Sequence, residues 1–529
     1  MNPSTLPDRQ AILLSLVLIV GLILLSGGIS VFVLSDPALG QAYALIRAAQ
    51  RIDTFYFDEV SSEQLVRTAH RGMFDLLDRY SGYVSADEFD QLKEELTGTY
   101  AGIGVSVVEH ELGLLIMSVR EDGPSRKVGL KTGNIIIATD SVELAGLRTS
   151  ESTRLLRGKE GTNVQIRVFR PVSNDTIEVY ITRARMSLIH VPFAGYTPDS
   201  ALYIRLLDFD AGASEQIRIA FDSLLGLSPN RPCGIILDLR GNPGGLFQEA
   251  WKTANLFLEE GTLVVGTDAR SHWNTQEVRA TGPDITEGLP LAILVDRGSA
   301  SSSEILAGAL QQAERAVLVG DTTFGKGLVQ GFVSFPDGDG LRLTISRFYF
   351  DNDVYLNEFD STLNDTGHGL VPDYFFEYID DNEFVQTIEN SLLLQRFVNL
   401  HQDEIASSSG KNIMLSGWID SLELFLDQEG FIFTSFRTRE LESILQEACL
   451  DDCSETSEQT IRKAVRMSEE EDRRQLHQFS SFLTMRLQQM ACKQAFGTYR
   501  AYKDIIIRQR PDIQFALGLL RENSLKTSK

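Results

Sequence analysis

Between Leu188 and Tyr378 the chain alternates short apolar runs with helical patterns, and this alternation restricts the possible folds more than any other feature. The runs ALYIRLL, CGIILDLR and LAILVD each precede a turn and a helical pattern, and the run AVLVG closes the series. Such a pattern predicts parallel strands joined by crossover helices. We therefore expect an α/β sheet whose strands present their carboxyl ends at one edge, where proteins of this class bind ligands.

The regions on either side have a different texture. From Tyr100 to Arg185, short strand-like runs alternate with Gly-rich turns, which is typical of a compact, mostly β module. The stretch from Pro37 to Leu96 and the region beyond Asp380 show apolar residues at helical spacing. A chain of 529 residues is long enough for about three or four domains of this kind.

One segment near the start is not globular. From Ala11 to Leu34 the chain carries no charged residue. At about 1.5 Å per residue, this run is long enough to cross a hydrocarbon core of about 30 Å. A cleaved signal peptide is the alternative, but the segment lacks a basic start and a convincing small-x-small cleavage site. The sequence therefore predicts an uncleaved transmembrane anchor.

Composition narrows the possible partners. The formal net charge of -24 argues against a nucleic-acid partner. Among the four cysteines, Cys233 lies in a predicted buried strand, where a thiol acts as a small apolar group. In an oxidising compartment, Cys449 is able to pair with either Cys453 or Cys492, and the sequence leaves that choice open. The cysteine and histidine spacing does not predict a zinc site.

The stretch GDTTFGKGLVQ, from Gly320 to Gln330, has the glycine and lysine spacing of a phosphate-binding loop. However, Gly327 occupies the position where such a loop carries a magnesium-binding Ser or Thr. The loop should also lead into a helix, whose N-terminus completes the anion site. Here it leads into LVQGFVSF, a PDGDG turn and LRLTISRFYF, which together predict a hairpin. A nucleotide at Lys326 is therefore a weak hypothesis.

Two further strand ends carry small and polar residues: LDLRGNPGG (Leu237–Gly245) and VDRGSASSSE (Val295–Glu304). A serine nucleophile in the second segment needs a base, and no histidine falls in these segments; His272 and His368 are the nearest in this region. A lysine replaces histidine when burial lowers its pKa from about 10.4 towards 7–8. Lys326 has apolar neighbours suited to this role, and Ser–Lys pairs are an established catalytic variant.

An acyl-transfer site also needs N–H donors for the developing oxyanion. The NPGG turn offers the N–H groups of Gly244 and Gly245, and the residue after the nucleophile offers another at a helix N-terminus. Each segment alone also fits a plain structural role, since Ser302 or Ser303 is suited to cap a helix. Their joint occurrence at three strand ends favours a catalytic site.

Taken together, DLRGNPGG, GSASSSEI and GKGLVQ resemble the core motifs of the carboxyl-terminal processing peptidases, also called tail-specific proteases. The resemblance implies a Ser–Lys dyad on a crotonase-like α/β protease core with an inserted PDZ domain. It implies Ser301 as nucleophile, Lys326 as general base and Gln330 as the residue that assists the lysine. It further implies that the oxyanion hole uses the backbone of Gly244, Gly245 and Ser302, where Ser302 replaces the alanine usual in the family.

The resemblance extends into the β module. The run YAGIGVSV is similar to the start of the family's PDZ domain, which implies that Gly102, Ile103, Gly104 and Val105 form the loop that receives a peptide carboxylate. Such a loop offers N–H groups while the peptide adds as an extra strand. Arg157 matches an arginine that couples the PDZ domain to the active site, although an ordinary surface arginine is an equally good interpretation.

These observations predict a multidomain α/β protein. The expected parts are a tail (1–10), a transmembrane anchor (11–35), a helical lead-in (36–98), a PDZ domain (99–186), a protease core (187–380) and a helical C-terminal domain (381–529). The expected function is a membrane-anchored, ATP-independent serine endopeptidase that needs no cofactor or metal. Its expected substrates are proteins or peptides with free C-termini, and a homo-oligomer or an adaptor is a possible assembly. The resemblance places it in the cytoplasmic (inner) membrane with its catalytic body in the periplasm or extracytoplasmic space; the alternative is a catalytically silent PDZ-type scaffold.

Overall fold

The computed structural model describes residues 37–521, apart from residues 87, 90–97, 121, 172, 228–230, 271–274, 337, 351–353, 357–368, 377–381, 402–403, 406–416 and 451–454. The predicted tail and the predicted anchor over 11–35 lie outside the described residues, as do His272 and His368. Among the helices of the described part, none combines the length and the apolar composition that crossing a bilayer requires.

The chain divides into two compact units, and the smaller one holds described residues 37–86 together with residues 332–343. Its helices are α2 (Pro37–Phe55) and α3 (Ser62–Phe74). Ser61 caps α3, because its hydroxyl oxygen accepts a hydrogen bond from the N–H of Gln64 at 3.1 Å. The strand β1 (Gly82–Val84) pairs antiparallel with residues 340–342 of the chain.

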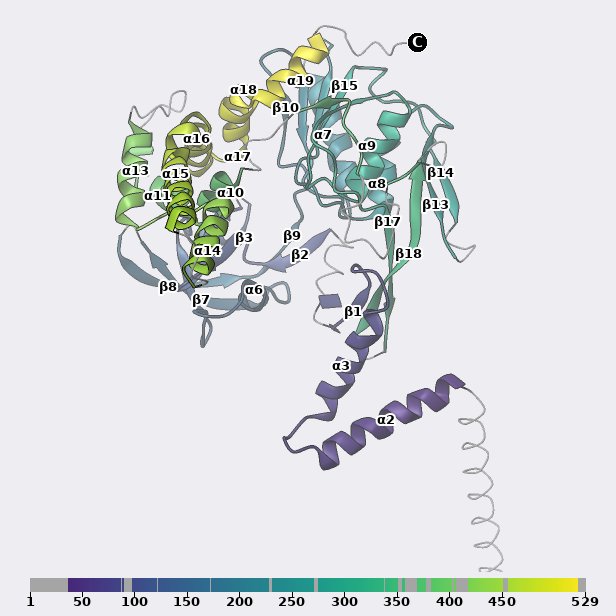
Figure 1. The fold of residues 1–529 in the computed structure, drawn as a ribbon. Helices are drawn as coiled ribbons and strands as arrows, with labels where there is room; N and C mark the ends of the chain where they lie inside the picture. Colours follow the sequence, from purple (N-terminus) through teal and green to yellow (C-terminus); the bar gives the residue numbers. More distant parts are fainter. Residues whose placement is uncertain are drawn as a thin grey trace, which may run out of the picture. The chain divides into compact units, whose positions relative to one another are not determined.

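The larger unit is built on a sheet with the strand order β10-β11-β12-β15-β16-β20 (Figure 1). Its strands are β10 (Phe193–Tyr196), β11 (Leu202–Arg205), β12 (Ile235–Asp238), β15 (Leu291–Val295), β16 (Val317–Gly320) and β20 (Tyr374–Phe375). From β11 to β20 all neighbouring strands are parallel, and β10 is antiparallel to β11. The predicted parallel sheet is confirmed.

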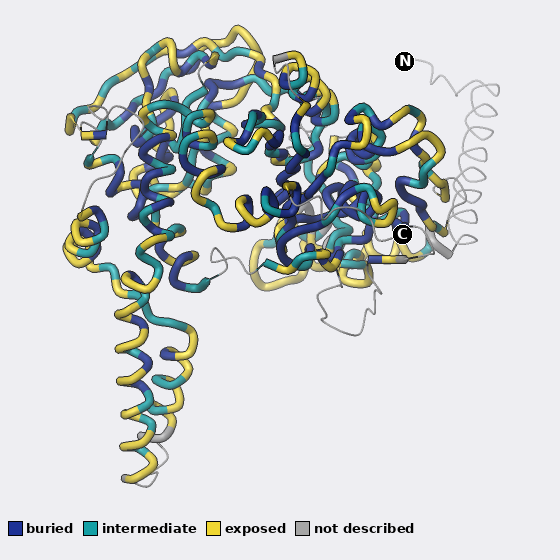
Figure 2. Tube along the Cα trace, turned by 90° about the horizontal axis from the view of Figure 1, so that it is seen from above, coloured by how far each residue is buried: buried dark blue, intermediate teal, exposed yellow. Residues whose placement is uncertain are grey.

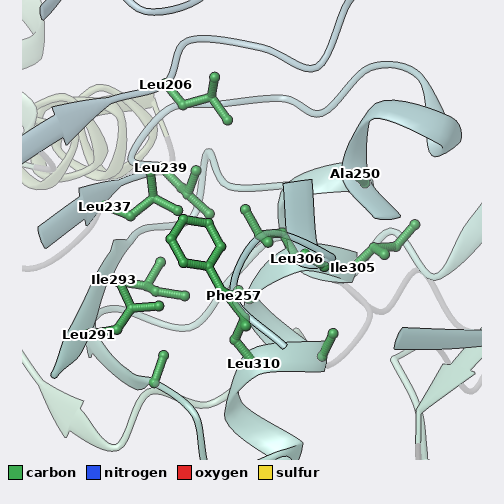
Figure 3. Close-up of a cluster of buried hydrophobic side chains, with 14 of the residues drawn as sticks. Leu206, Leu237, Leu239, Ala250, Phe257, Leu291, Ile293, Ile305, Leu306 and Leu310 are labelled. Carbon is green, nitrogen blue, oxygen red and sulfur yellow. The ribbon is translucent and has the colours of Figure 1, made fainter. Parts of the chain in front are cut away.

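One face of this sheet is covered by the crossover helices α7 (Ala213–Leu227), α8 (Phe247–Ala254) and α9 (Ser302–Gln312). Figure 3 shows Phe257 and Leu306 packed among strand residues such as Leu237 and Ile293. Successive strand residues point to opposite faces, so the neighbours of these residues point away from the crossover helices. A second apolar layer is therefore needed on the other face.

The end of the chain provides that second layer. Strand residues Ile236, Ala292, Leu294 and Val319 pack against the π-helical turn η4 (Tyr502–Ile506), α18 (Ile507–Gln509) and α19 (Pro511–Arg521). In Figure 1, α19 is the yellow helix beside the sheet. The region predicted as one helical domain over 381–529 is thus divided by its packing, because residues 502–521 complete the α/β core.

The rest of that region forms a helical body with its own apolar core. Its helices are α10 (Glu383–Asn390), α11 (Leu393–Leu400), α13 (Trp418–Gln428), α14 (Phe436–Leu450), α15 (Glu455–Gln478), α16 (Ser480–Phe496) and α17 (Thr498–Ala501). Figure 2 distinguishes the buried interior of these layers from exposed surface, and most residues of α15 are exposed or half-buried. The helical body lies in sequence between β20 and η4, so the chain leaves the core and then returns to it.

A second sheet of the protease region contains the predicted hairpin. Besides β1, its strands are β13 (Leu263–Asp268), β14 (Gln276–Arg279), β17 (Leu328–Ser334), β18 (Gly340–Phe350) and β19 (Val354–Tyr355), and β17 pairs with β18. The hairpin after Lys326 is therefore confirmed. A strand follows this lysine where a phosphate-binding loop requires a helix, which counts against the nucleotide hypothesis.

The β module has a sheet of its own with the order β3-β4-β5-β7-β8, and β6 pairs with β5. Its elements are β3 (Val105–His110), β4 (Gly113–Val119), α5 (Pro124–Lys127), β5 (Ile135–Thr139), β6 (Val142–Glu143), α6 (Thr149–Leu156), β7 (Asn163–Arg170) and β8 (Asp175–Thr182). A separate pair joins β2 (Thr99–Gly102) to β9 (Ala184–Ser187). Within the described residues, β3 pairs with β4 only and packs against α6.

A pair of glycine substitutions tests the packing of the core. At Gly308 of α9, an added Cβ would lie 2.3 Å from the ring of Phe350, whereas at Gly226 of α7 it would meet nothing within 4 Å. We expect Gly308→Ala to destabilise the core by about 1–3 kcal/mol through overpacking. Gly226→Ala should stabilise it by about 0.5–1 kcal/mol, because alanine favours the helix. Denaturant unfolding measures both, and equal effects would contradict the packing.

Candidate active site

Three strand ends meet at one edge of the core sheet, as the sequence predicts. The strand β15 lies between β12 and β16 and is parallel to both, so the segments that follow these strands start side by side. These segments are residues 239–245 after β12, residues 296–301 after β15 and residues 321–327 after β16. All the residues that the sequence nominates for catalysis lie in these segments, at the start of α9 or in β17.

The serine-rich turn is bonded to the glycine-rich loop through its hydroxyl groups. Ser299 donates to the carbonyl of Leu239 at 2.9 Å, and Ser303 donates to the carbonyl of Asn242 at 2.8 Å. Ser302 donates to the carbonyl of Gly245 at 3.0 Å. These bonds give three of the turn's serines a role in holding the two segments together. They distinguish those serines from Ser301, the residue nominated as nucleophile.

Ser301 has an unusual backbone. Its φ of 55° and ψ of -112° lie outside the regions that a residue with a side chain ordinarily adopts. Ser301 immediately precedes the first residue of α9, so its side chain lies where the helix begins, and it is half-buried. Strain of this kind persists only where the surroundings enforce it, and it concentrates at functional sites.

The residue that enforces this arrangement is Glu304, whose side chain is fully buried. One carboxylate oxygen of Glu304 accepts the N–H of Ser301 at 2.8 Å and the N–H of Lys326 at 2.9 Å. Its other oxygen accepts the N–H of Gly325 and the hydroxyl of Thr323, both at 2.6 Å. A single carboxylate therefore joins the backbone of the nominated nucleophile to the backbone of the nominated base.

The electrostatics of Glu304 reflect two opposing influences. Burial raises the pKa of Glu304, the hydrogen bonds from Thr323, Gly325, Ser301 and Lys326 lower it, and the net shift is upward. All four partners are donors, and an ionised carboxylate only accepts hydrogen bonds, so the geometry suits the charged form.

Lys326 lies in the third segment, directly before β17. Its Nζ is 3.4 Å from Oε1 of Gln330, and both side chains are half-buried. The spacing of four residues that nominated Gln330 as a helper therefore brings the two side chains into contact. The hydroxyl of Thr323 also accepts the N–H of Leu370 at 2.8 Å, so Leu370 supports the lysine loop from a segment that is distant in sequence.

The nominated oxyanion donors lie against the nucleophile. A Cβ on Gly244 would be 2.9 Å from both the Cβ of Ser301 and the N of Ser302, so only glycine allows this approach. The N–H of Gly244 donates to Oδ1 of Asn242 at 2.9 Å and is therefore engaged within the loop. Among the described residues, no acceptor is recorded for the N–H of Gly245 or of Ser302. Those two groups remain available for a ligand.

A buried histidine supports the glycine-rich loop from behind. His190 Nδ1 is 2.5 Å from Oδ1 of Asp208, and its Nε2 is 3.2 Å from the carbonyl of Ala211. Next to this pair, Phe209 donates its N–H to the carbonyl of Gly244 and accepts a hydrogen bond from Leu246 N–H. Burial lowers the pKa of His190, but Asp208, Asp210 and the carbonyl of Ala211 together raise it, and the net shift is upward.

The peptide-binding residues nominated in the β module also lie together. Gly102, Ile103 and Gly104 are buried, and the chain turns between β2 and β3 at Gly104, whose φ is 79°. Arg157 follows α6, and its Cγ lies 3.9 Å from the position of a Cβ on Gly102. The Arg157 guanidinium lies 5.7 Å from the centre of the Tyr100 ring. Val105 begins β3, the strand that pairs on one side only within the described residues.

The structure tests one of the two disulfide pairings that the sequence left open for Cys449. Cys492 is a free, buried thiol in α16, and burial raises its pKa to about 11. The pairing of Cys449 with Cys492 is therefore not formed in this structure. The side chain of Cys449 and all of Cys453 lie outside the described part of the chain. Cys233 is also free, but it is half-buried and lies two residues before β12, so its predicted place in a buried strand is wrong.

Comparisons with known proteins decide the family. Residues 200–367 match the sequence model of peptidase family S41, and residues 101–181 match that of a PDZ domain. The carboxy-terminal processing protease CtpA of Bacillus subtilis (strain 168) is 30% identical over 352 residues, which cover 64% of this chain and 73% of that protein. The chain belongs to the carboxyl-terminal processing peptidases.

Other relatives of this peptidase carry similar names. The carboxy-terminal-processing protease of Bartonella bacilliformis is 29% identical over 330 residues, which cover 62% of this chain and 73% of that protein. Among solved structures, the photosystem II D1 C-terminal processing protease is 24% identical, covers 63% of this chain and 92% of its own, and has a TM-score of 0.37. The two family models give this peptidase an S41 protease fold with a PDZ domain, and its C-terminal region is helical.

Sequence reasoning missed several residues that shape the site of this peptidase. Glu304 was detectable, because Ser301-x-x-Glu304 has the spacing of a capping box, in which the glutamate reaches back to the first N–H. Asn242 follows the pattern of a short polar residue that bonds the backbone two positions on. By contrast, no local pattern marks His190 or Asp208 as supports of the glycine-rich loop.

A first prediction concerns Glu304. Replacing it with glutamine places an amide N–H₂ against N–H and O–H donors, which leaves at least one buried donor unpaired. We expect Glu304→Gln to reduce the free energy of unfolding by about 1–3 kcal/mol and to lower kcat more than it raises KM. Glu249, buried in α8 and bonded to the N–H of Ser214 at 3.0 Å, supplies the control. Glu249→Gln should lose stability but keep kcat, and an equal loss of kcat in both would contradict the bridging role.

A second prediction concerns pH. Because the pKa of His190 is raised above 6.5, its contribution to stability is complete below about pH 6.5 and is lost as the pH rises through the folded-state value. We expect the melting temperature to fall across that range and the fall to be smaller in His190→Gln. The exposed His477 provides a control, since His477→Gln should keep the parental pH dependence. The same slope in all three proteins would exclude the His190–Asp208 pair as its cause.

Proposed function

We propose that this peptidase is a membrane-anchored, ATP-independent serine endopeptidase that uses a Ser301–Lys326 dyad on proteins recognised through their C-terminal tails. The observation that carries the proposal is the shared carboxylate of Glu304, which binds the backbone N–H groups of both residues. Two segments that are distant in sequence are held together at the point where the family's nucleophile and base are expected. Membership of the family supports the reaction class.

The chemistry follows from the properties of the two groups. Lys326 Nζ, in its uncharged form, takes the proton of the Ser301 hydroxyl as Oγ attacks the scissile carbonyl. The resulting ammonium then donates that proton to the leaving amine as the peptide bond breaks and the acyl-enzyme forms. A water molecule, deprotonated by the same amine, hydrolyses the ester and restores Ser301. Gln330, within 3.4 Å of Nζ, orients the lysine.

The developing oxyanion needs donors on the opposite side of the carbonyl. The N–H groups of Gly245 and Ser302 are the best candidates, because neither has an acceptor recorded among the described residues. Ser302 is the first residue of α9, so the helix dipole adds to the stabilisation of negative charge. Gly244 contributes mainly by its lack of a side chain, which allows the loop to approach Ser301.

Recognition of the substrate tail is assigned to the PDZ domain. A peptide added along β3 would have its terminal carboxylate at Gly102–Val105, where backbone N–H groups receive it. The packing of α6 against β3 supplies one wall for the peptide side chains. Arg157 lies beside this loop and is the proposed link between an occupied PDZ domain and the protease core.

The proposed location is the cytoplasmic (inner) membrane, with residues 11–35 as a single-pass anchor and the catalytic body in the periplasm or extracytoplasmic space. The uncharged run from Ala11 to Leu34 supports the anchor, and the net charge of -24 suits a body that does not bind nucleic acid. A homo-oligomer or an adaptor protein is the proposed form of regulation, and neither is needed for the chemistry.

The proposal is tested with the full chain purified in mild detergent. An unstructured peptide that ends in apolar residues with a free carboxylate should be cleaved, and the rate should rise with pH because only the uncharged amine accepts a proton. Ser301→Ala and Lys326→Ala should each reduce the rate by roughly 10³-fold or more without unfolding the protein. Ser223→Ala, which removes a hydroxyl at an exposed position of α7, is the matched control and should retain full activity.

The same experiment separates the alternatives. A peptide with a C-terminal amide should be cleaved more slowly, because it lacks the carboxylate that the PDZ loop receives. Binding of the free-carboxylate peptide without cleavage at any pH would favour the silent scaffold. Full activity of Ser301→Ala would eliminate the assigned nucleophile.

A further inference from the structure

The glycine-rich loop begins at Arg240, and the side chain of this residue points away from the active site. Along β12 the side chains alternate, so Asp238 shares the face of Ile236, which packs against the C-terminal segment. Arg240 lies two residues beyond the end of β12, and its guanidinium pairs on this face with Asp238 and Asp512. Asp238 and Arg240 are buried, with exposed fractions of 1% and 8%. The base of the loop therefore lies in a buried, charged environment on the side opposite the crossover helices.

Arg240 is held by two acidic residues from distant parts of the chain. Its Nε donates to Oδ1 of Asp238 at 2.8 Å and its Nη2 donates to Oδ2 of the same residue at 2.5 Å. Its Nη1 forms an ion pair with Oδ2 of Asp512, in the first turn of α19. Asp512 is itself 1% exposed. One guanidinium thus joins the start of the glycine-rich loop to the last helix of the chain.

The network around this pair is dense. Arg205 donates to Oδ1 of Asp238 at 3.0 Å and also to the carbonyl of Arg240. Arg510 donates to Oδ2 of Asp512 at 3.1 Å. Burial would raise the pKa of Asp238, but the guanidinium groups of Arg205 and Arg240 lower it far below its usual range. Asp238 therefore stays charged, and three guanidinium groups share two carboxylates in a region without bulk water.

Removing the Asp512 carboxylate from this network is expected to move the side chain of Arg240. Without the charge of Asp512, Arg240 loses one of its ion pairs and competes with Arg205 for the carboxylate of Asp238. A buried guanidinium that loses a partner moves towards another acceptor or towards water. Because Gly241 follows Arg240 directly, such a movement shifts the backbone that leads to Gly244 and Gly245.

We propose that Asp512 is a positioning residue for the oxyanion loop, and that it acts through Arg240 without touching the substrate. The assignment rests on the proposed function of Gly245 and Ser302 as oxyanion donors. Helix α19 thereby has a role in the reaction besides covering the sheet. Asp512, in its first turn, sets the geometry of the glycine-rich loop that follows β12.

The test compares Asp512→Asn with Arg521→Gln in the full chain. Arg521 lies at the other end of α19, where it pairs with Asp199 at the surface, so its replacement disturbs the docking of the same helix away from the loop. We expect Asp512→Asn to lower kcat by roughly ten- to hundredfold with little change in KM, since a small displacement of a catalytic group has an effect of this size. Arg521→Gln should leave both constants unchanged.

A second readout does not depend on catalysis. Hydrogen exchange of the backbone amides in residues 239–246 is measured in the Ser301→Ala background, where Asp512→Asn should speed exchange and Arg521→Gln should not. If Asp512→Asn fails to fold, Asp512→Glu is tested in its place. It keeps the charge but adds a methylene group in a buried site, and it should also lower kcat at unchanged KM. Parental kcat and parental exchange in a folded Asp512 variant would overturn the proposal. An inactive parent would instead count against the proposed function and leave the exchange result to decide this inference.

Discussion

The candidate active site of this peptidase depends on the burial of one carboxylate, that of Glu304. An ionised glutamate inside a protein is unfavourable unless its oxygens are fully hydrogen-bonded, and Glu304 meets this condition with four donors. Those donors come from the serine turn and from the lysine loop, so the two segments are obliged to lie together. Because α9 is buried from Ser302 to Leu310, the carboxylate itself has little freedom to move. The strained backbone of Ser301 is a consequence of this arrangement.

The two faces of the core sheet have different origins. The crossover helices that cover one face follow directly from the alternation of strands and helices, as parallel sheets require. The other face is covered by η4, α18 and α19, which follow the whole helical body in the sequence. In sequence, the helical body therefore lies between two parts of the core, whereas the PDZ domain precedes the core strands β10–β16. A chain that ended before α19 would leave Ile236, Leu294 and the charged side chain of Asp238 uncovered.

Much of the core was predictable because its determinants are local. About ten residues of sequence are enough to recognise each of them. They are the apolar runs around Leu237 and Ile293, the turn residues of the hairpin after Lys326, and the small residues at three strand ends. The pairing of buried charged residues cannot be predicted from such short stretches of sequence. Arg240 and Asp512 are separated by 272 positions, and the sequence offers many other acidic residues that an arginine is able to meet. Burial and geometry select among them, and both are properties of the folded chain.

The sequence alone determined that this chain builds a parallel α/β sheet, that serine-rich and glycine-rich segments share its ligand-binding edge, and that a β module precedes it. It determined these features because periodicity and turn residues act over short distances. Only the tertiary structure decided that Glu304 binds both Ser301 and Lys326. The tertiary structure also decided that the last helix completes the core and that its Asp512 pairs with Arg240 at the base of the glycine-rich loop. The physical reason is that hydrogen bonds and ion pairs in a dry interior depend on which surfaces are buried together, and local sequence does not encode that choice.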